Sequence, residues 1–234
     1  MTDESSVVYI VDDDQSMRKF LRRLVSLSGW QSETFASAEE FMDRVRSDTP
    51  GCLLLDIRMP GLSGLDLQQE LSQARIHIPI IFITGHGDIP MSVQAMKAGA
   101  VSFLTKPLRN QELLDAIQEA INVDRSMREL RKEHANLQQL FNLLTSRERE
   151  VFTLVATGLQ NKKIAGELEI SERTVKAHRK QIMSKMKVNS LADLVRIAGR
   201  LGVTSAYVQP ISIYTNRLTC SRVDGLARTV WPNA

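Results

Sequence analysis

The first 120 residues alternate short apolar runs with helix-like segments, and this alternation constrains the fold more than any other feature of the chain. Each apolar run has the length of a strand, and in each following segment the apolar residues recur at helical spacing. Such alternation predicts an α/β fold, a doubly wound five-stranded parallel sheet with helices on both faces. The expected strands are 7–11, 32–35, 52–57, 78–84 and 101–105, and the expected helices are 16–27, 38–46, 64–71, 90–98 and 110–123.

Polar side chains follow four of these strands, at the point where each strand ends. Three aspartates, 12–14, follow the first strand, Asp56 ends the apolar part of the third, Thr84 ends the fourth and Lys106 follows the fifth. Because ligands of such sheets bind at the carboxyl ends of the strands, we expect these groups to converge. Clustered carboxylates favour a cation, and oxygen ligands suit Mg²⁺. A carboxylate beside Mg²⁺ can attack a phosphoryl group, whose charge a lysine and a hydroxyl help to neutralise.

The region from about Val7 to Ala120 resembles the receiver domain of two-component response regulators. Within that superfamily the segment GHGDIPMSVQAMKAGA (85–100) is most similar to the FixJ type. The motifs occur in the right order along the chain, which makes the resemblance specific. They are VDDD (11–14), LLDIRMPGLSG (54–64), FITGHGD (82–88) and AMKAGAVSFLTKP (95–107).

The resemblance implies a role for each residue of the acidic group. Asp56 is implied as the phosphorylation site. Asp13 and Asp56 are implied as direct ligands of Mg²⁺, together with the backbone carbonyl of Arg58, while Asp12 acts on the metal through water. The resemblance describes a protein that accepts and slowly loses a phosphoryl group, and that is not a turnover enzyme.

Three further residues are implied to sense the phosphoryl group. Thr84 and Lys106 contact its oxygens, and Phe103 is the aromatic switch that turns inward when the threonine moves. The bond between Lys106 and Pro107 is expected to be cis, a geometry that is essentially confined to bonds before proline. Each of these residues is unremarkable when taken singly, because a lone lysine is usually an exposed surface charge.

The second half of the chain differs from the first in charge. Residues 1–124 carry 11 Lys and Arg against 18 Asp and Glu, whereas residues 125–234 carry 19 against 9. The Thr145–Glu148 segment fits a capping box, and four helical segments follow it, the third of them basic. Two short helices joined by a tight turn predict a helix-turn-helix, whose second helix enters the major groove of DNA.

The stretch from Leu144 to Val195 resembles the LuxR-type four-helix DNA-binding domain almost throughout. By that resemblance the recognition helix reads the groove with one set of residues and contacts phosphates or flanking groups with another. The first set is Lys176, Ala177 and Lys180, and the second is Thr174 and Arg179.

Between the two regions, residues 120–141 contain neither glycine nor proline. Leu130, Leu137 and Leu144 recur at intervals of seven, so this segment is either a helical linker that pairs in a dimer or a solvated continuation of the preceding helix. We expect a receiver domain over 6–122, a helical linker over 123–141, an all-α LuxR-type domain over 142–203 and a tail of unknown structure over 204–234.

The combined resemblance implies a cytoplasmic response regulator with several partners. A sensor histidine kinase phosphorylates Asp56, and the regulator binds double-stranded DNA, forms a homodimer on phosphorylation, contacts RNA polymerase and does not engage membranes. One alternative is a DNA-binding regulator that works without phosphorylation. A second is an aspartyl-phosphate hydrolase, because the aspartates 12–14 can be mistaken for the DxD motif of that class; the DNA-binding region downstream and the acceptor-like Asp56 argue against it.

Overall fold

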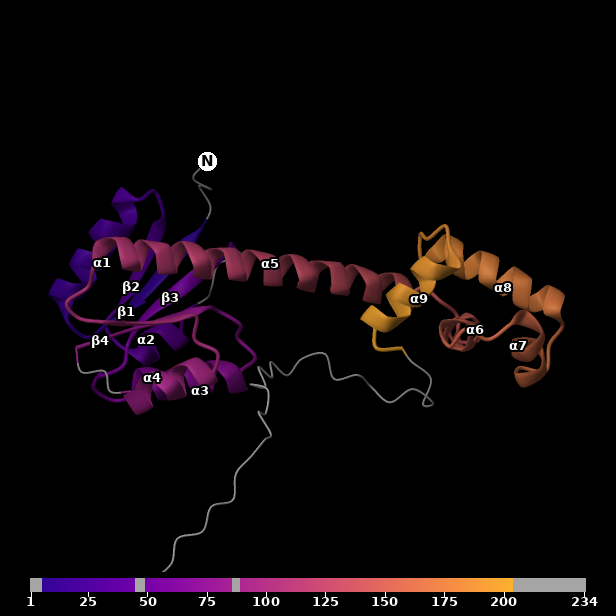
Figure 1. Ribbon diagram of the computed structural model, residues 1–234, viewed down its shortest axis with the longest axis horizontal. Coiled ribbons are helices and arrows are strands. Elements are labelled where there is room, and N and C mark those ends of the chain that lie inside the picture. The colour runs from indigo at the N-terminus through magenta and orange to yellow at the C-terminus, as the bar shows by residue number, and fades with distance from the viewer. Residues whose placement is uncertain (1–5, 45–48, 86–88, 204–234) are drawn as a thin grey trace, which may run out of the picture. The chain divides into compact units, whose positions relative to one another are not determined.

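The computed structural model describes residues 6–44, 49–85 and 89–203, and it divides the chain into two compact units, with the division between Asn136 and Leu137 (Figure 1). The predicted boundaries at 122 and 141 differ from this division and stay predictions. The tail over 204–234 lies outside the described residues. The helix expected over 38–46 is shorter than predicted, because it ends at Met42, and residues 45–46 lie outside the described residues.

The N-terminal unit is built on the predicted parallel sheet, whose strands lie in the order β2-β1-β3-β4-β5. This order places β1 and β3 at the switch point of a doubly wound sheet, where such folds bind their ligands. The strands are β1 (Val7–Val11), β2 (Gln31–Phe35), β3 (Gly51–Asp56), β4 (Ile80–Thr84) and β5 (Ser102–Thr105), and the helices are α1 (Gln15–Leu27), α2 (Ala38–Met42), α3 (Gly64–Gln73), α4 (Ile89–Lys97) and α5 (Asn110–Asn142).

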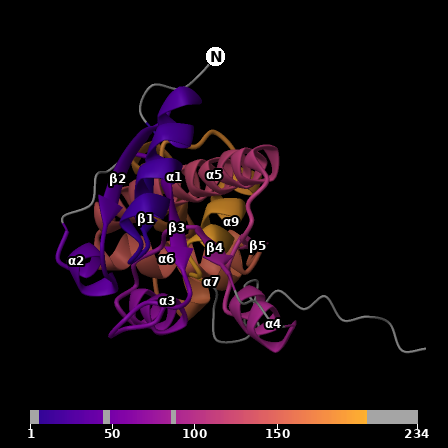
Figure 2. The ribbon, with the colours of Figure 1, turned by 90° about the vertical axis from the view of Figure 1, so that its left-hand side faces the viewer.

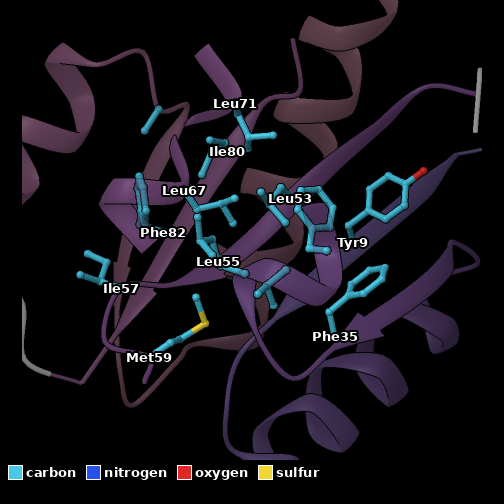
Figure 3. Close-up of a cluster of buried hydrophobic side chains, with 14 of the residues drawn as sticks. Tyr9, Phe35, Leu53, Leu55, Ile57, Met59, Leu67, Leu71, Ile80 and Phe82 are labelled. Atoms are coloured by element: carbon cyan, nitrogen blue, oxygen red, sulfur yellow. The ribbon is translucent and has the colours of Figure 1, made fainter. Parts of the chain in front are cut away.

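Helices cover both faces of this sheet (Figure 2). Side chains of β1, β3 and β4 alternate between the two faces, so that Leu53 and Leu55 join one core and Leu54 joins the other. The first core packs against α2, α3 and α4 and contains the aromatic group of Tyr9 and Phe35 (Figure 3). The second core packs against α1 and α5.

Helix α5 runs without a break from Asn110 to Asn142, so it joins the helix expected over 110–123 and the helical segment expected to follow it into one element. No glycine or proline interrupts this segment, so no local signal stops the helix. The predicted repeat was wrong at its third leucine, because Leu144 lies beyond the end of α5 and is buried in the core of the C-terminal unit.

Over its described residues, 137–203, the C-terminal unit is helical, as predicted, and the four helices that follow α5 there enclose one apolar core. The capping box is confirmed: Glu148 Oε2 accepts the N–H of Thr145 at 2.7 Å, and Thr145 Oγ1 accepts the N–H of Glu148 at 3.2 Å. Val175 and Ile182 are buried, which leaves the opposite face of their helix exposed. The helices are α6 (Ser146–Ala156), α7 (Asn161–Glu167), α8 (Glu172–Lys185) and α9 (Leu191–Arg200).

Candidate functional sites: an acidic pocket and a basic helix

The register of the sheet brings the predicted polar residues to one edge. Val11 pairs with Leu55, so Asp12 and Asp56 follow neighbouring positions at the ends of β1 and β3. Thr84 pairs with Thr105 at the ends of β4 and β5, directly before Lys106. Asp12, Asp56 and Thr84 are all buried, whereas Asp13 is exposed. Parallel pairing therefore collects groups that lie up to 94 residues apart in sequence.

Lys106 links the two buried carboxylates. Its Nζ lies 3.0 Å from Asp12 Oδ2 and 3.3 Å from Asp56 Oδ2, and its backbone N–H donates to the carbonyl of Thr84 at 2.8 Å. The bond between Lys106 and Pro107 is cis, as expected. One ammonium group thus faces both the predicted acceptor and a predicted metal-binding residue.

The electrostatics of the pocket combine burial with attraction between opposite charges. Burial raises the pKa of the Asp56 carboxyl, and the neighbouring Asp12 adds to this rise, while Lys106 opposes it. For Lys106, burial acts to lower the pKa, but the two carboxylates outweigh it and the pKa lies above its ordinary value. The lysine is therefore held as a cation at neutral pH.

The acidic cluster has the donor set of a divalent cation site. Asp12, Asp13 and Asp56 can each offer one carboxylate oxygen, with all three oxygens within 4.8 Å of one another. Asp56 Oδ1 is buried and accepts no hydrogen bond from the described residues. Buried acceptors in proteins normally have a hydrogen-bond donor or a cation as partner. Mg²⁺ prefers oxygen ligands such as these carboxylates. The residues present therefore fit the predicted ion.

Two residues that the sequence reasoning did not single out help to shape the pocket. Arg18 Nη1 donates to the backbone carbonyl of Asp12 at 2.6 Å, which ties α1 to the end of β1. Gly64, at the start of α3, packs so closely that a Cβ there would lie 2.3 Å from the carbonyl oxygen of Asp56. The glycine is visible in the LLDIRMPGLSG motif, whereas no sequence signal marks the contact of Arg18.

Phe103, the predicted switch, is half-buried on β5 and packs against the core of the α2–α4 face. It also lines a groove between β5 and α5, together with Arg109, Glu112 and Glu119 among others. Nearby, α4 exposes three apolar side chains, with exposed fractions of 79% for Ile89, 44% for Val93 and 46% for Met96. These residues form an apolar surface beside β5, the strand that carries Phe103.

The predicted DNA-reading residues lie on the exposed side of α8. Lys176, Ala177 and Lys180 are exposed and lie within about one turn of the helix. Thr174 is half-buried, and its hydroxyl lies 2.9 Å from Ser171 Oγ at the N-terminus of the helix. A shallow groove beside α8 is lined by Asn161, Lys176, Arg179, Lys180, Met183, Val188 and Asn189.

Contacts among the helices fix the position of α8. Arg179 Nη1 donates to Asn161 Oδ1 at 2.5 Å, which ties α8 to the start of α7. Lys185 Nζ lies 2.6 Å from the carboxylate of Glu148, which is buried in the first turn of α6. The sequence reasoning missed the pairing of Lys185 with Glu148, because residues 37 positions apart leave no periodic signal.

Comparison with known proteins agrees with both units. Residues 8–118 match the family model "Response regulator receiver domain". Residues 142–198 match the family model "Bacterial regulatory proteins, luxR family". The fold and the two sites thus define a protein that joins a receiver domain to a LuxR-type DNA-binding domain, and the helix-turn-helix prediction is confirmed at the level of the family.

Individual relatives extend over most of the chain. Nodulation protein W of Bradyrhizobium diazoefficiens is 50% identical over 208 residues, which cover 89% of this chain and 92% of the relative. Transcriptional regulatory protein FixJ of Rhizobium meliloti is 42% identical over 202 residues, covering 85% and 96%.

Solved structures of response regulators also match most of the chain. The response regulator StyR matches with a TM-score of 0.73 and 50% identity, covering 83% of this chain and 98% of that one. Full-length FixJ from B. japonicum matches with a TM-score of 0.52 and 38% identity, covering 86% and 98%. The chain belongs to the response regulators, and its relatives are of the FixJ type. Among the described residues, no helix has the length and apolar character needed to cross a membrane.

Proposed function

We propose that Asp56 accepts a phosphoryl group from a sensor histidine kinase and that this event controls DNA binding by α8. The observation that carries the proposal is the position of Asp56, buried at the end of β3 with its Oδ2 3.3 Å from Lys106 Nζ and within the cluster of ligand oxygens. A receiver domain and a LuxR-type domain in one chain imply a phosphodonor kinase and DNA as partners.

The chemistry of the transfer follows from the pocket. A carboxylate oxygen of Asp56 attacks the phosphorus of a phosphohistidine, a P–O bond forms, the P–N bond breaks and the imidazole leaves with a proton. In this proposal Asp13, Asp56 and the carbonyl of Arg58 would hold Mg²⁺ directly, with Asp12 acting on it through water. When bound there, Mg²⁺ would neutralise charge on the phosphoryl oxygens. Lys106 contributes a second cation at the same place.

The response to phosphorylation involves Thr84 and Phe103. The hydroxyl of Thr84 and the ammonium of Lys106 are proposed to bind phosphoryl oxygens, and Phe103 then turns further into the core beside β5. In the phosphorylated state, the exposed apolar face of α4 and β5, with Ile89 and Met96, contacts the same face of a second copy and so forms the homodimer. Dimerisation raises DNA affinity because two linked domains bind two half-sites at a high effective concentration.

On DNA, α8 is proposed to lie in the major groove. Lys176, Ala177 and Lys180 face base edges, while Thr174 and Arg179 contact phosphates or flanking groups. The exposure of the first three residues supports this assignment. Contact with RNA polymerase and a location in the cytoplasm stay predictions of the family resemblance.

The test is phosphorylation of the full chain with acetyl phosphate and Mg²⁺, followed by intact-mass measurement and light scattering. We expect wild type to gain one phosphoryl group and to rise in molecular mass, and Asp56→Asn to do neither. A folded wild type that stays unmodified and still binds DNA would instead establish the phosphorylation-independent regulator.

A further inference from the structure

A stripe of side chains on α5 has no role in the function proposed above. Val123, Met127, Leu130 and His134 follow one another at intervals of four, three and four, which places them on one side of the helix. We call this set the linker seam. The exposed fractions of the first three are 40%, 47% and 47%, and His134 is exposed as well. Leu137 continues the spacing in the sequence.

The seam is distinct from the side of α5 that packs on the sheet. That side ends at Asp124, whose carboxylate is buried. Its Oδ2 accepts hydrogen bonds from the backbone N–H of Gly51 at 3.0 Å and from the Nε–H of Arg128 at 2.6 Å. At 100° per residue, Met127 and Leu130 lie roughly 60° and 120° around the helix from Asp124. These contacts fix the rotation of α5 about its own axis where it leaves the sheet, so the seam does not face the sheet.

The seam begins next to a groove that borders the switch residue. Glu119, about one helical turn before Val123, lines this groove together with Phe103 of β5. A dimer contact made by β5 therefore lies close to the start of the seam.

We infer that the linker seam pairs with the same seam of a second copy of this chain, as a parallel two-stranded coiled coil. The inference rests on the proposed function, because it extends the phosphorylation-driven dimer into the linker. It assigns this second contact to the helix between the two domains, where heptad spacing and an exposed apolar stripe coincide.

The charges beside the seam favour the parallel orientation. Arg131, whose guanidinium also lies 3.5 Å from Asp124 Oδ1 of its own chain, is on one flank of the seam, and Glu133 is on the other. In a parallel pair, the flank with Arg131 runs along the partner flank with Glu133, whereas an antiparallel pair sets like flanks together. His134 occupies a core position, where a single polar residue specifies register at a cost in stability.

Cysteine cross-linking of the full chain tests the pairing. Leu130→Cys and, as the matched control, Glu129→Cys are made in a Cys220→Ser background, in which the remaining Cys52 is buried. Each is phosphorylated with acetyl phosphate and Mg²⁺, oxidised mildly and run on a non-reducing gel. We expect disulfide-linked dimers for Leu130→Cys alone, because identical seam positions face each other in a parallel pair. Equal cross-linking of both variants, or of neither, overturns the inference.

Dimer affinity gives a second test that misfolding cannot imitate. We expect His134→Leu to tighten the phosphorylated dimer and Leu130→Lys to weaken it by about tenfold or more, since two seam leucines lose their burial. Asn136→Lys, outside the seam, leaves it unchanged. If wild type dimerises but no seam variant changes the constant, the inference fails while the proposed function stands. If phosphorylated wild type remains monomeric, both fail.

Discussion

Gly64 is a position where one added methyl group should disturb both the packing of the receiver domain and its acidic pocket. In Gly64→Ala, the new Cβ would lie 2.3 Å from the carbonyl oxygen of Asp56 and 3.0 Å from Cα of Ile57. Both neighbours are backbone atoms, so the end of β3 must move, since no side chain can swing away. Overpacking of this kind costs about 1–3 kcal/mol, and each kcal/mol lowers the melting temperature of such a domain by about 4 °C.

The displacement also reaches the phosphorylation site, because Asp56 itself must shift. A misplacement of about 1 Å at a reacting group can slow a reaction by about a hundredfold, so we expect phosphorylation of Gly64→Ala by acetyl phosphate to slow by about ten- to a hundredfold. Thermal melting by circular dichroism and intact-mass time courses measure the two effects.

Gly85→Ala is the matched control for this prediction. Gly85 follows β4 at the same edge of the sheet, and a Cβ there meets nothing within 4 Å. We expect both its melting temperature and its phosphorylation rate to match wild type. If Gly64→Ala behaves like this control, the close packing of α3 against the end of β3 is not what positions Asp56.

Three further predictions concern the metal, the C-terminal unit and DNA. Mg²⁺ at ten times its dissociation constant should stabilise the wild-type receiver by about 1.4 kcal/mol, and Asp13→Asn should abolish this shift in a melting assay; an equal shift in the variant would exclude the exposed aspartate as a ligand. Burial acts to raise the pKa of Glu148, but hydrogen bonds from Lys185 and Thr145 outweigh it and hold the pKa below the ordinary value of 4.5. The stabilisation by Glu148 is therefore complete above pH 4.5 and is lost as the pH falls through the lowered pKa. As the pH falls through this range, the melting temperature should decrease more for wild type than for Glu148→Gln. An equal decrease in both proteins would contradict this. Lys180→Ala should lower operator affinity by about 1–3 kcal/mol and relax specificity at the base that it faces, as measured by fluorescence anisotropy with the operator and with single-base variants of it; an unchanged affinity would remove Lys180 from the interface.

The sheet and its polar edge could be predicted because their signals are local. Each strand is a short apolar run, and Asp56, Thr84 and Lys106 stand where such runs end. Parallel pairing then requires these ends to meet, so the pocket follows from topology without any knowledge of contacts. The capping box at Thr145 and Glu148 was equally visible, because both residues lie within one helical turn.

Features that depend on distant partners could not be predicted in this way. Asp124 reads as one more charge in a polar helix, yet it is buried against Gly51, 73 residues earlier. Leu144 fits a heptad by its spacing, but the chain leaves the helix at Asn142 and the leucine enters another core. Periodicity describes one helix at a time, and tertiary packing decides which side of that helix is used.

The most direct test of the account is to locate the acyl phosphate itself. The full chain is phosphorylated with acetyl phosphate and Mg²⁺, reduced with borohydride so that the acyl phosphate becomes homoserine, and mapped by peptide mass spectrometry. The account predicts homoserine at Asp56 and at no other aspartate. Homoserine at Asp12 or Asp13, or none in a chain whose receiver is folded, would contradict it.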